Sequence, residues 1–253
     1  MKILIGLPTP DTVPVEFALG SLPDIIAYTG KNLKNLDNLA ISYVKGVRTD
    51  RNRNVILKRA IEDGGFSHIL WLDVDMVYPR DIICQYFNVE KGFDIIGCLY
   101  FRKHPPYPPV GYIKNNKNPE LPFSVLDPKL LESDKAYEVD GLGFGGMMVS
   151  MKVYEKMGRK KWMHYGDNYH LPYKTKGRLT HDLQFCQEAQ EAGFKIGLHG
   201  GVRPAHIATT FITEDVHNSH REARMKEIAK QVKEQKKIEE MANDVEVTIK
   251  KKK

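Results

Sequence analysis

The chain has 253 residues and a mass of 28.9 kDa, which suits one α/β domain, or one domain with an appendage, and is long enough to bury a sizeable core. Its hydrophobic fraction of 42% is ordinary for a globular protein, and no window approaches the run of about 18 apolar residues that a membrane span requires. From Arg221 to Lys253, eleven Lys or Arg residues stand against seven Asp or Glu, so most of the formal net charge of +6 belongs to this tail. Because the body is close to neutral, the charge gives no argument that the folded domain binds nucleic acid, and we expect no specific nucleic-acid partner. Binding of nucleic acid through the lysine tail is left as a further alternative.

Cysteine usage and the N-terminal segment bear on the compartment. Cys84, Cys98 and Cys186 lie far apart and form no C-x-x-C pair, which predicts reduced core residues. The chain passes directly from an apolar segment at its start into a turn, so we expect no cleaved secretory signal. These features predict a cytoplasmic protein without a transmembrane segment.

The first strand is expected over Lys2–Leu7, where a short apolar run is followed by Pro8, Thr9 and Pro10. These residues predict a turn at the carboxyl end of the strand. Such a turn is a natural place for backbone groups to meet a nucleotide base. An ordinary connection between a strand and a helix fits the same residues.

A polar segment, Arg48–Asn54, leads into an amphipathic helix that Gly64 or Gly65 ends. Backbone N–H groups at a helix start and guanidinium groups both favour phosphate, so the segment indicates an anion site. Arg53 and Asn54 lie at the expected helix start and are the main candidates. For Arg48 and Arg51 a solvated basic face is the more natural interpretation.

The strongest signal is the stretch Ser67–Pro79, which reads SHILWLDVDMVYP. Its apolar run, Ile69–Leu72, predicts a strand buried on both faces, and Asp73 and Asp75 follow at once. Because side chains alternate along a strand, we expect both carboxylates to point to the same side, within reach of one cation at the carboxyl edge of the sheet. A turn, or a cap for a helix that starts near Pro79, is the alternative.

Two stretches between the strands have compositions that ligand sites use. Phe101–Ile113 contains four prolines and several aromatic residues, and it is either a plain surface loop or one wall of a binding site. Gly141–Ser150 is rich in glycine but lies in the wrong place for a dinucleotide fingerprint. Its glycines predict a close approach of the backbone to a ligand or a neighbouring helix.

Three features of the second half complete the candidates. The long aromatic segment 159–179 predicts either a lid, because sugar rings stack on aromatic faces, or a disordered loop; its candidate residues are Trp162, His164 and Tyr165. Asp182 falls in the first turn of a helix capped by Thr180, where the helix dipole alone favours a carboxylate. His206 stands alone, and lone histidines are more often surface or core residues than ligands.

The remaining hydrophobic patterns predict the other elements. They are an interrupted helix over 15–28, helices over 79–87, 151–157 and 181–192, strands over 39–44, 93–100, 136–140, 147–150 and 195–198, and a charged amphipathic helix from about 213 that ends in four lysines.

Taken in order, the segments resemble a GT-A-fold glycosyltransferase of the family 2-like nucleotide-sugar type. They are a first strand ending in Pro-Thr, the Arg-Asn helix start, LDVDM-x-x-P, DGLGFGGMMVS, HDLQFCQEAQEAGFKI and PAHI, and they span Lys2–Ile207. The resemblance implies an α/β fold with a Rossmann-like, mainly parallel sheet flanked by helices. It also implies a catalytic domain over 1–212. The tail over 213–253 lies outside the resemblance, and its charge pattern predicts a charged helix whose last residues are disordered.

The resemblance implies a metal site and a catalytic base. Asp75 would be the main ligand of Mn²⁺ or Mg²⁺, Asp73 would contact the metal or the ribose, and His206 would be the third protein ligand. Oxygen ligands with one imidazole suit these hard cations. Asp182 would be the catalytic base. His181 stands where the family has an acidic residue, and this departure leaves the acceptor site and the activity open.

Further positions are implied for the donor. Pro8 and Thr9 would lie against the base, and Arg53 and Asn54 near the nucleotide. Gly145 and Gly146 would border the donor sugar and the acceptor.

The implied activity is transfer of a sugar from a UDP- or GDP-type donor to a hydroxyl group of a glycan, lipid-linked or protein acceptor. One base and no second carboxylate nucleophile suggest direct displacement with inversion. A nucleotidyltransferase that uses Asp73 and Asp75 to hold Mg²⁺ is one alternative, and it would turn over nucleoside triphosphates. A non-catalytic nucleotide-sugar or glycan-binding module, with His181 marking a lost acceptor site, is the other, and it would bind donor without turnover.

Overall fold

The computed structural model describes residues 1–46, 48–89, 92–115, 123–158, 162–163, 179–208 and 211–230. Seven strands form the central sheet in the spatial order β2-β1-β3-β9-β5-β10-β8. Five strands run in one direction: β1 Lys2–Thr9, β2 Asn38–Lys45, β3 His68–Trp71, β5 Ile95–Cys98 and β10 Ile196–His199. Two run in the other: β8 Ala136–Val139 and β9 Met147–Ser150. The predicted α/β class with a mainly parallel sheet is confirmed.

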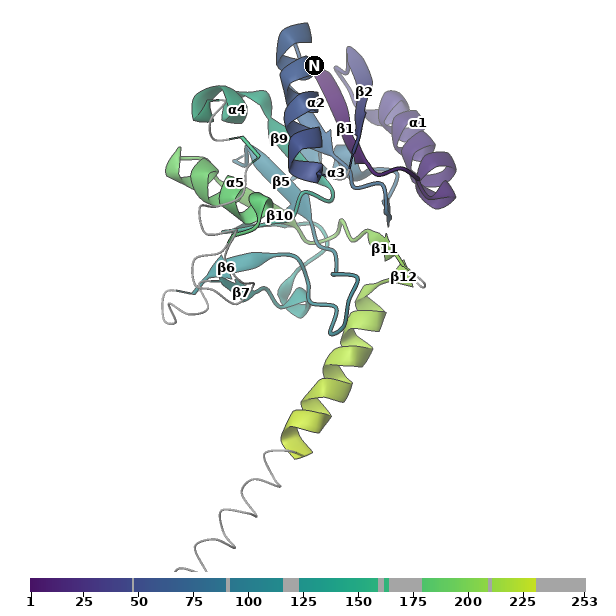
Figure 1. Cartoon of the computed structure of the whole chain (residues 1–253), viewed down its shortest axis with the longest axis vertical. Coiled ribbons are helices and arrows are strands. Elements are labelled where there is room, and N and C mark those ends of the chain that lie inside the picture. The colour runs from purple at the N-terminus through teal and green to yellow at the C-terminus, as the bar shows by residue number, and fades with distance from the viewer. Residues whose placement is uncertain are drawn as a thin grey trace, which may run out of the picture.

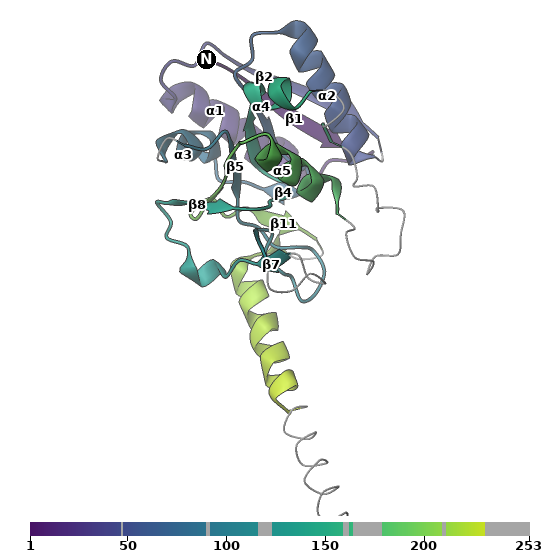
Figure 2. The same ribbon diagram turned by 90° about the vertical axis from the view of Figure 1, so that its left-hand side faces the viewer.

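Helices cover both faces of the sheet (Figures 1 and 2). One face packs against α2 (Thr49–Asp63), α4 (Met151–Met157) and α5 (His181–Glu191), and the other against α1 (Leu22–Asn32) and α3 (Ile82–Asn88). Because side chains alternate along a strand, β1 sends Leu4 into the first cluster of buried residues and Ile3 and Ile5 into the second. The interruption predicted in the first helix is a π-helical segment, Glu16–Ser21, directly before α1.

Short strands that the sequence did not predict form two smaller sheets. The first is three-stranded, β12-β11-β4, and the second is two-stranded, β6-β7. Their bounds are β4 Met76–Val77, β6 Tyr112–Lys114, β7 Phe123–Val125, β11 Ala205–Ile207 and β12 Phe211–Ile212, and a 3₁₀ helix spans Pro128–Leu130. Strands of two or three residues are too short for an alternating pattern to be recognised in a sequence.

The turn predicted at Pro8 and Thr9 is wrong, because β1 continues through both residues and pairs with β2 as far as Thr9. In this ladder the Gly6 carbonyl accepts from Leu72 of the β3 side and the Thr9 carbonyl accepts from Gly46 of the β2 side. Alternation therefore turns Pro8 toward the β3 side, beyond the last residue that pairs with β3. The missing N–H of proline costs no ladder hydrogen bond at that position.

Two other boundaries differ from the prediction at places that matter for the site. Strand β3 ends at Trp71, so Asp73 and Asp75 lie in the turn between β3 and β4, and strand alternation does not orient them. Helix α2 begins at Thr49, so Arg53 and Asn54 lie inside the helix and not before it.

The helix at the end of the described chain, 214–230, projects from the body in both views (Figures 1 and 2). Its first turn is anchored by His217, whose ring stacks on Phe101 with centroids 4.6 Å apart. A division between a domain over 1–212 and a tail remains a prediction. Within the described residues, no helix combines the length and the apolar character needed to cross a membrane.

Candidate active site

The two carboxylates after β3 lie in a turn that a buried tyrosine holds together. The hydroxyl group of Tyr78 accepts a hydrogen bond from the Asp73 N–H at 2.9 Å and donates to the Asp73 carbonyl at 3.1 Å. Burial raises the pKa of Tyr78 well above its usual value, so the phenol stays neutral and can donate. The Asp73 and Asp75 side chains remain 29% and 38% exposed and are accessible to a ligand.

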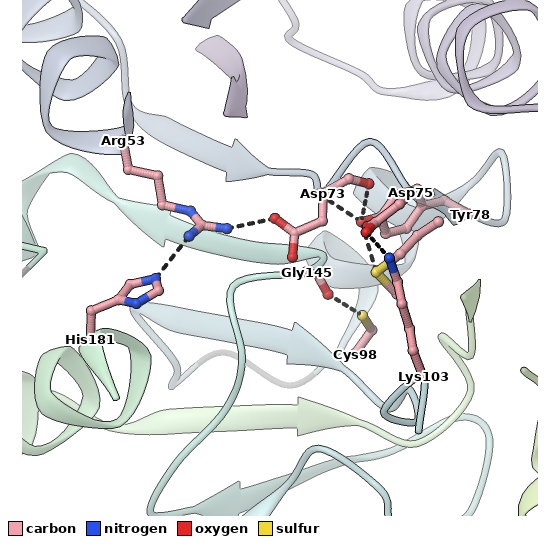
Figure 3. Close-up of polar contacts among 9 residues, drawn as sticks. Arg53, Asp73, Asp75, Tyr78, Cys98, Lys103, Gly145 and His181 are labelled. Carbon is pink, nitrogen blue, oxygen red and sulfur yellow. Dashed lines mark hydrogen bonds and ion pairs between the residues drawn. The ribbon is translucent and has the colours of Figure 1, made fainter. Parts of the chain in front are cut away.

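Asp73 is paired with the buried guanidinium group of Arg53, which reaches it from α2 (Figure 3). The distance from Arg53 Nη2 to Asp73 Oδ1 is 2.5 Å. Arg53 is only 3% exposed, and its guanidinium lies 4.7 Å from the centre of the Phe144 ring. The charge is therefore neutralised on one side by a carboxylate and covered on another by an aromatic face.

His181, the residue that stands where the family has an acidic one, is the second partner of Arg53. Its Nε2 lies 2.9 Å from Arg53 Nη1, and its ring lies parallel to that of Phe144, with 5° between the planes. A guanidinium can only donate, so Nε2 must be the acceptor and the imidazole must be neutral. Burial lowers the pKa of His181, Asp182 opposes the change and Arg53 adds to it, which favours the neutral form.

Asp75 is paired with a different cation. Lys103 Nζ contacts Asp75 Oδ2 from the proline-rich segment that follows β5, on the side of the carboxylates away from Arg53 (Figure 3). This segment is therefore one wall of the site and not a plain surface loop. The sequence is compatible with both possibilities for the segment, and nothing in it singles out Lys103.

The glycine-rich segment before β9 packs directly against the strand ends. A Cβ atom added at Gly145 would lie 2.8 Å from Met76 Sδ and 3.2 Å from Asp73 Oδ2. Gly146 has φ +86°, and a Cβ there would lie 2.5 Å from Cys98 Sγ. These glycines allow a close approach of the backbone to its neighbours, which are side chains of β4, β5 and the turn that contains Asp73. A close approach to a ligand remains a prediction.

Tyr100 is a site residue that sequence reasoning missed. It is the second residue after β5, and a Cβ at Gly143 would lie 1.9 Å from its hydroxyl oxygen. Burial raises the pKa of Tyr100 well above its usual value, and the carboxylates of Asp73 and Asp182 add to the shift. The phenol is thus a neutral hydrogen-bond donor near two carboxylates. The rule that drew attention to Asp73, that functional residues follow buried strands, applies equally to Tyr100.

The segment of His206 lies beside the turn that contains the carboxylates. Strand β11 pairs with β4, which sets His206 opposite Met76, and the Ile207 N–H donates to the Asp75 carbonyl at 2.8 Å. His206 is 8% exposed, and its Nδ1 contacts the Phe101 carbonyl. Its ring meets Tyr100 edge to face, with centroids 5.3 Å apart.

The side chains of Asp73, Asp75 and His206 are of types that bind a divalent cation, but they are not arranged as a complete set of metal ligands. The described residues contain no group of three or more His, Cys, Asp or Glu side chains arranged to hold a metal ion. Asp73 and Asp75 each face a side-chain cation of the chain itself. The carboxylate of Asp75 thus already binds a positive group at a partly exposed position, and carboxylate oxygens with an imidazole suit Mn²⁺ or Mg²⁺.

Asp182 lies at the start of α5, as predicted, and is held by its own helix end. Its Oδ1 accepts hydrogen bonds from the Leu183 N–H at 3.1 Å and from the Thr180 hydroxyl. Thr180 is the N-cap residue, but its hydroxyl makes this contact instead of a cap to the backbone. Among the described residues, none donates a hydrogen bond to Asp182 Oδ2, so this oxygen can accept one from a ligand.

Some of the other predicted site residues have structural partners. The Thr9 hydroxyl donates to the Val44 carbonyl at 3.2 Å. The Asn54 side chain donates to the Met163 carbonyl and accepts from the Met163 N–H, at 2.8 and 3.1 Å. Trp162 is buried in the core and donates to the Tyr154 carbonyl at 3.4 Å. A core position accounts for Trp162 without an acceptor, while His164 and Tyr165 lie outside the described residues.

Among known proteins, the similarity found is one of fold and not of sequence. No family model matches the sequence, and no curated protein matches it. The solved structure of A197 from STIV has a TM-score of 0.51 and 16% identity, over 84% of this chain and 94% of A197. The chain shares the fold of A197. At this identity, the likeness to A197 concerns the fold alone.

Two more distant matches are solved structures of glycosyltransferases. GalNAc-T7, solved with UDP, GalNAc and Mn²⁺, has a TM-score of 0.48 and 9% identity over 84% of this chain and 44% of that one. The catalytic domain of Drosophila β1,4-galactosyltransferase 7, in complex with xylobiose, has a TM-score of 0.43 and 14% identity over 78% and 64%. The chain thus spans less than two thirds of either, and similarity this low carries no argument beyond that from A197.

Proposed function

We propose that the chain is a metal-dependent glycosyltransferase. It would move a sugar from a UDP- or GDP-type donor to a hydroxyl group of a glycan, lipid-linked or protein acceptor, with inversion. The proposal rests on the ordered motifs that resemble GT-A enzymes and on the polar residues gathered past the carboxyl ends of β3 and β5, where ligands bind in open α/β sheets.

One observation supports the proposal most. The Asp-x-Asp turn and the Pro-Ala-His segment are some 130 positions apart, yet the Ile207 N–H donates to the Asp75 carbonyl at 2.8 Å. A donor site of the proposed kind requires this meeting, because Asp75 and His206 must reach the same ion. If the Asp-x-Asp turn and His206 had separate structural roles, the two segments would not need to lie side by side.

In the proposed site, Asp75, Asp73 and His206 would hold Mn²⁺ or Mg²⁺. When bound, the ion neutralises the charge that builds up on the departing nucleoside diphosphate. Arg53 would hold the Asp73 carboxylate in position from the buried side. Gly145 and Gly146 would border the donor sugar and the acceptor, and Pro8 and Thr9 would lie against the base.

Asp182 would be the general base that takes the proton of the acceptor hydroxyl group. Its orientation through Oδ1, with Oδ2 lacking a partner among the described residues, suits that role. With one carboxylate base and no second carboxylate nucleophile proposed, direct displacement at the sugar carbon gives inversion. His181 would serve the site by supporting Arg53, in place of the acidic residue of the family.

A screen of nucleotide sugars tests the proposal. The purified chain is incubated with UDP- and GDP-sugars in Mn²⁺ or in chelator, and released diphosphate and thermal shift are measured. We expect one donor class to give Mn²⁺-dependent release, and Asp75→Ala to abolish it while a surface control, Asp63→Ala, does not. Release of pyrophosphate from nucleoside triphosphates would favour a nucleotidyltransferase. Donor binding without turnover on any acceptor, including water, would favour a binding module.

A further inference from the structure

The two carboxylates of the Asp-x-Asp turn have cations of different character. Arg53 is 3% exposed and is held by three neighbours, Asp73, His181 and the Phe144 ring. Lys103 is 33% exposed, and Asp75 is its ion-pair partner among the residues that the structure describes. Arg53 is therefore a fixed part of the site, whereas the Lys103 ammonium, on a flexible four-carbon stem, can leave its carboxylate at little cost.

The backbone that supports Lys103 is anchored, so that movement would be confined to the side chain. The segment closes through hydrogen bonds from the Arg102 N–H to the Pro108 carbonyl, at 3.0 Å, and from the Val110 N–H to the Tyr100 carbonyl, at 2.8 Å. His206 Nδ1 contacts the Phe101 carbonyl, which fixes the start of the segment to β11. Lys103 thus remains at this edge of the sheet whether or not it is paired with Asp75.

The Oδ2 atom of Asp75 cannot pair with the Lys103 ammonium and bind a divalent cation at the same time. The contact of Lys103 Nζ is with Asp75 Oδ2, and two positive groups at one carboxylate repel each other. An anion between the two cations removes this conflict. The diphosphate of a nucleotide sugar is such an anion, and a lysine ammonium is a common phosphate ligand.

We propose that Lys103 is a donor-phosphate residue that rests on Asp75 in the metal-free protein. It competes with a divalent cation for Asp75, and once displaced it binds the diphosphate of the donor. This inference rests on the proposed function. It adds a positively charged side chain for the diphosphate, which the Asp-x-Asp turn and His206 do not supply. It also predicts that removing the Lys103 charge strengthens the binding of the metal ion and weakens the binding of the nucleotide.

The test compares Lys103→Met with the wild type by titration calorimetry and Mn²⁺ electron paramagnetic resonance. With Mn²⁺ alone, we expect the variant to bind about fivefold more tightly, because the competing ammonium is gone. With saturating Mn²⁺, we expect UDP or GDP to bind about tenfold more weakly, because a charge-assisted hydrogen bond is lost. Lys103→Arg retains the charge, and we expect it to restore most of the nucleotide affinity.

Lys195→Met is the matched control, since Lys195 is also paired with a carboxylate, Glu138, at 2.8 Å on the sheet edge formed by β8 and β10. It removes the same charge and is expected to change neither affinity. Equal Mn²⁺ affinities in Lys103→Met and Lys195→Met, or an unchanged nucleotide affinity in Lys103→Met, would overturn the inference about Lys103 and leave the metal site standing. Absence of Mn²⁺ binding in every variant would overturn both the inference and the proposed metal site.

Discussion

Arg53 is the cation on which the buried side of the site depends. Removing its charge in Arg53→Met leaves Asp73 beside a buried apolar chain and deprives His181 of its donor. Because Asp73 is 29% exposed, water screens part of the loss, and we expect the free energy of unfolding to fall by roughly 2 kcal/mol. Urea denaturation of the variant and the wild type measures the change.

Arg51→Met is the control for this experiment, because Arg51 is an exposed residue of the same helix. Surface substitutions of this kind change stability by about 0.5 kcal/mol or less. Equal stabilities of Arg53→Met and Arg51→Met would mean that the Arg53–Asp73 pair does not stabilise the fold.

Gly143 is a second residue on which stability is expected to depend, because there is no space for a Cβ atom at this position. A Cβ there would lie 1.9 Å from the Tyr100 hydroxyl oxygen and 2.9 Å from Val110 Cγ1. In Gly143→Ala the Tyr100 ring must shift, and we expect a loss of about 1–3 kcal/mol, the usual cost of overpacking. Gly30→Ala in α1, where no atom lies within 4 Å of the new Cβ, should instead be neutral or stabilising. Thermal melts measure both variants. A lower melting temperature for Gly143→Ala, with an equal or higher one for Gly30→Ala, would confirm that Tyr100 packs closely on Gly143, and a neutral Gly143→Ala would refute it.

The start of α5 gives the fold a dependence on pH. Burial lowers the pKa of His181 in the folded chain, while in the unfolded chain it has the usual value of about 6.5. As the pH falls through 6.5 toward the folded pKa, the unfolded chain takes up a proton and the folded chain does not, so stability decreases. Burial also lowers the pKa of His68 and His199, which act in the same direction.

We therefore expect the free energy of unfolding to be lower at pH 5.5 than at pH 7.5, and the difference to shrink in His181→Gln. Glutamine cannot titrate, yet its side-chain oxygen can still accept from Arg53. Urea denaturation at the two pH values measures both effects. An identical pH dependence in the variant would show that His181 is not the group responsible.

Among the elements, the helices and the strands of the central sheet could be predicted from sequence, whereas the strands of two or three residues could not. The apolar run before Asp73 and the amphipathic pattern after Thr180 locate β3 and α5, because burial imposes a period on the sequence. Strands β4 and β11 have two and three residues and exist through pairing with each other. That pairing brings the segment of His206 beside the turn that contains Asp73 and Asp75. In the sequence, only the resemblance to GT-A enzymes pointed to it.

The same contrast holds for single members of the site. Asp73, Asp75 and Asp182 could be singled out from their positions at the ends of expected elements. Lys103 could not, since its partner lies 28 residues earlier and a basic residue in a proline-rich segment is ordinarily solvated. The burial of Arg53 was also not predicted, because an arginine in a polar helix start normally faces water.

For the molecule as a whole, charge and proposed activity belong to different parts of the chain. Deleting Lys250–Lys253 removes four positive charges from a chain with a formal net charge of +6. We expect the deletion to leave donor binding and diphosphate release unchanged and to weaken any salt-sensitive binding to nucleic acid. A gel-shift assay beside the release assay measures both. Loss of turnover would contradict the separation.

In the proposed site, the Asp-x-Asp turn and His206 share one divalent ion beside the donor diphosphate. Anomalous diffraction from crystals soaked with Mn²⁺ and UDP or GDP locates that ion. We expect one manganese peak within bonding distance of Asp75 and His206, with the nucleotide diphosphate on the ion and Lys103 released from Asp75. A bound nucleotide with no manganese peak at Asp75, or a peak that His206 does not reach, would contradict this expectation.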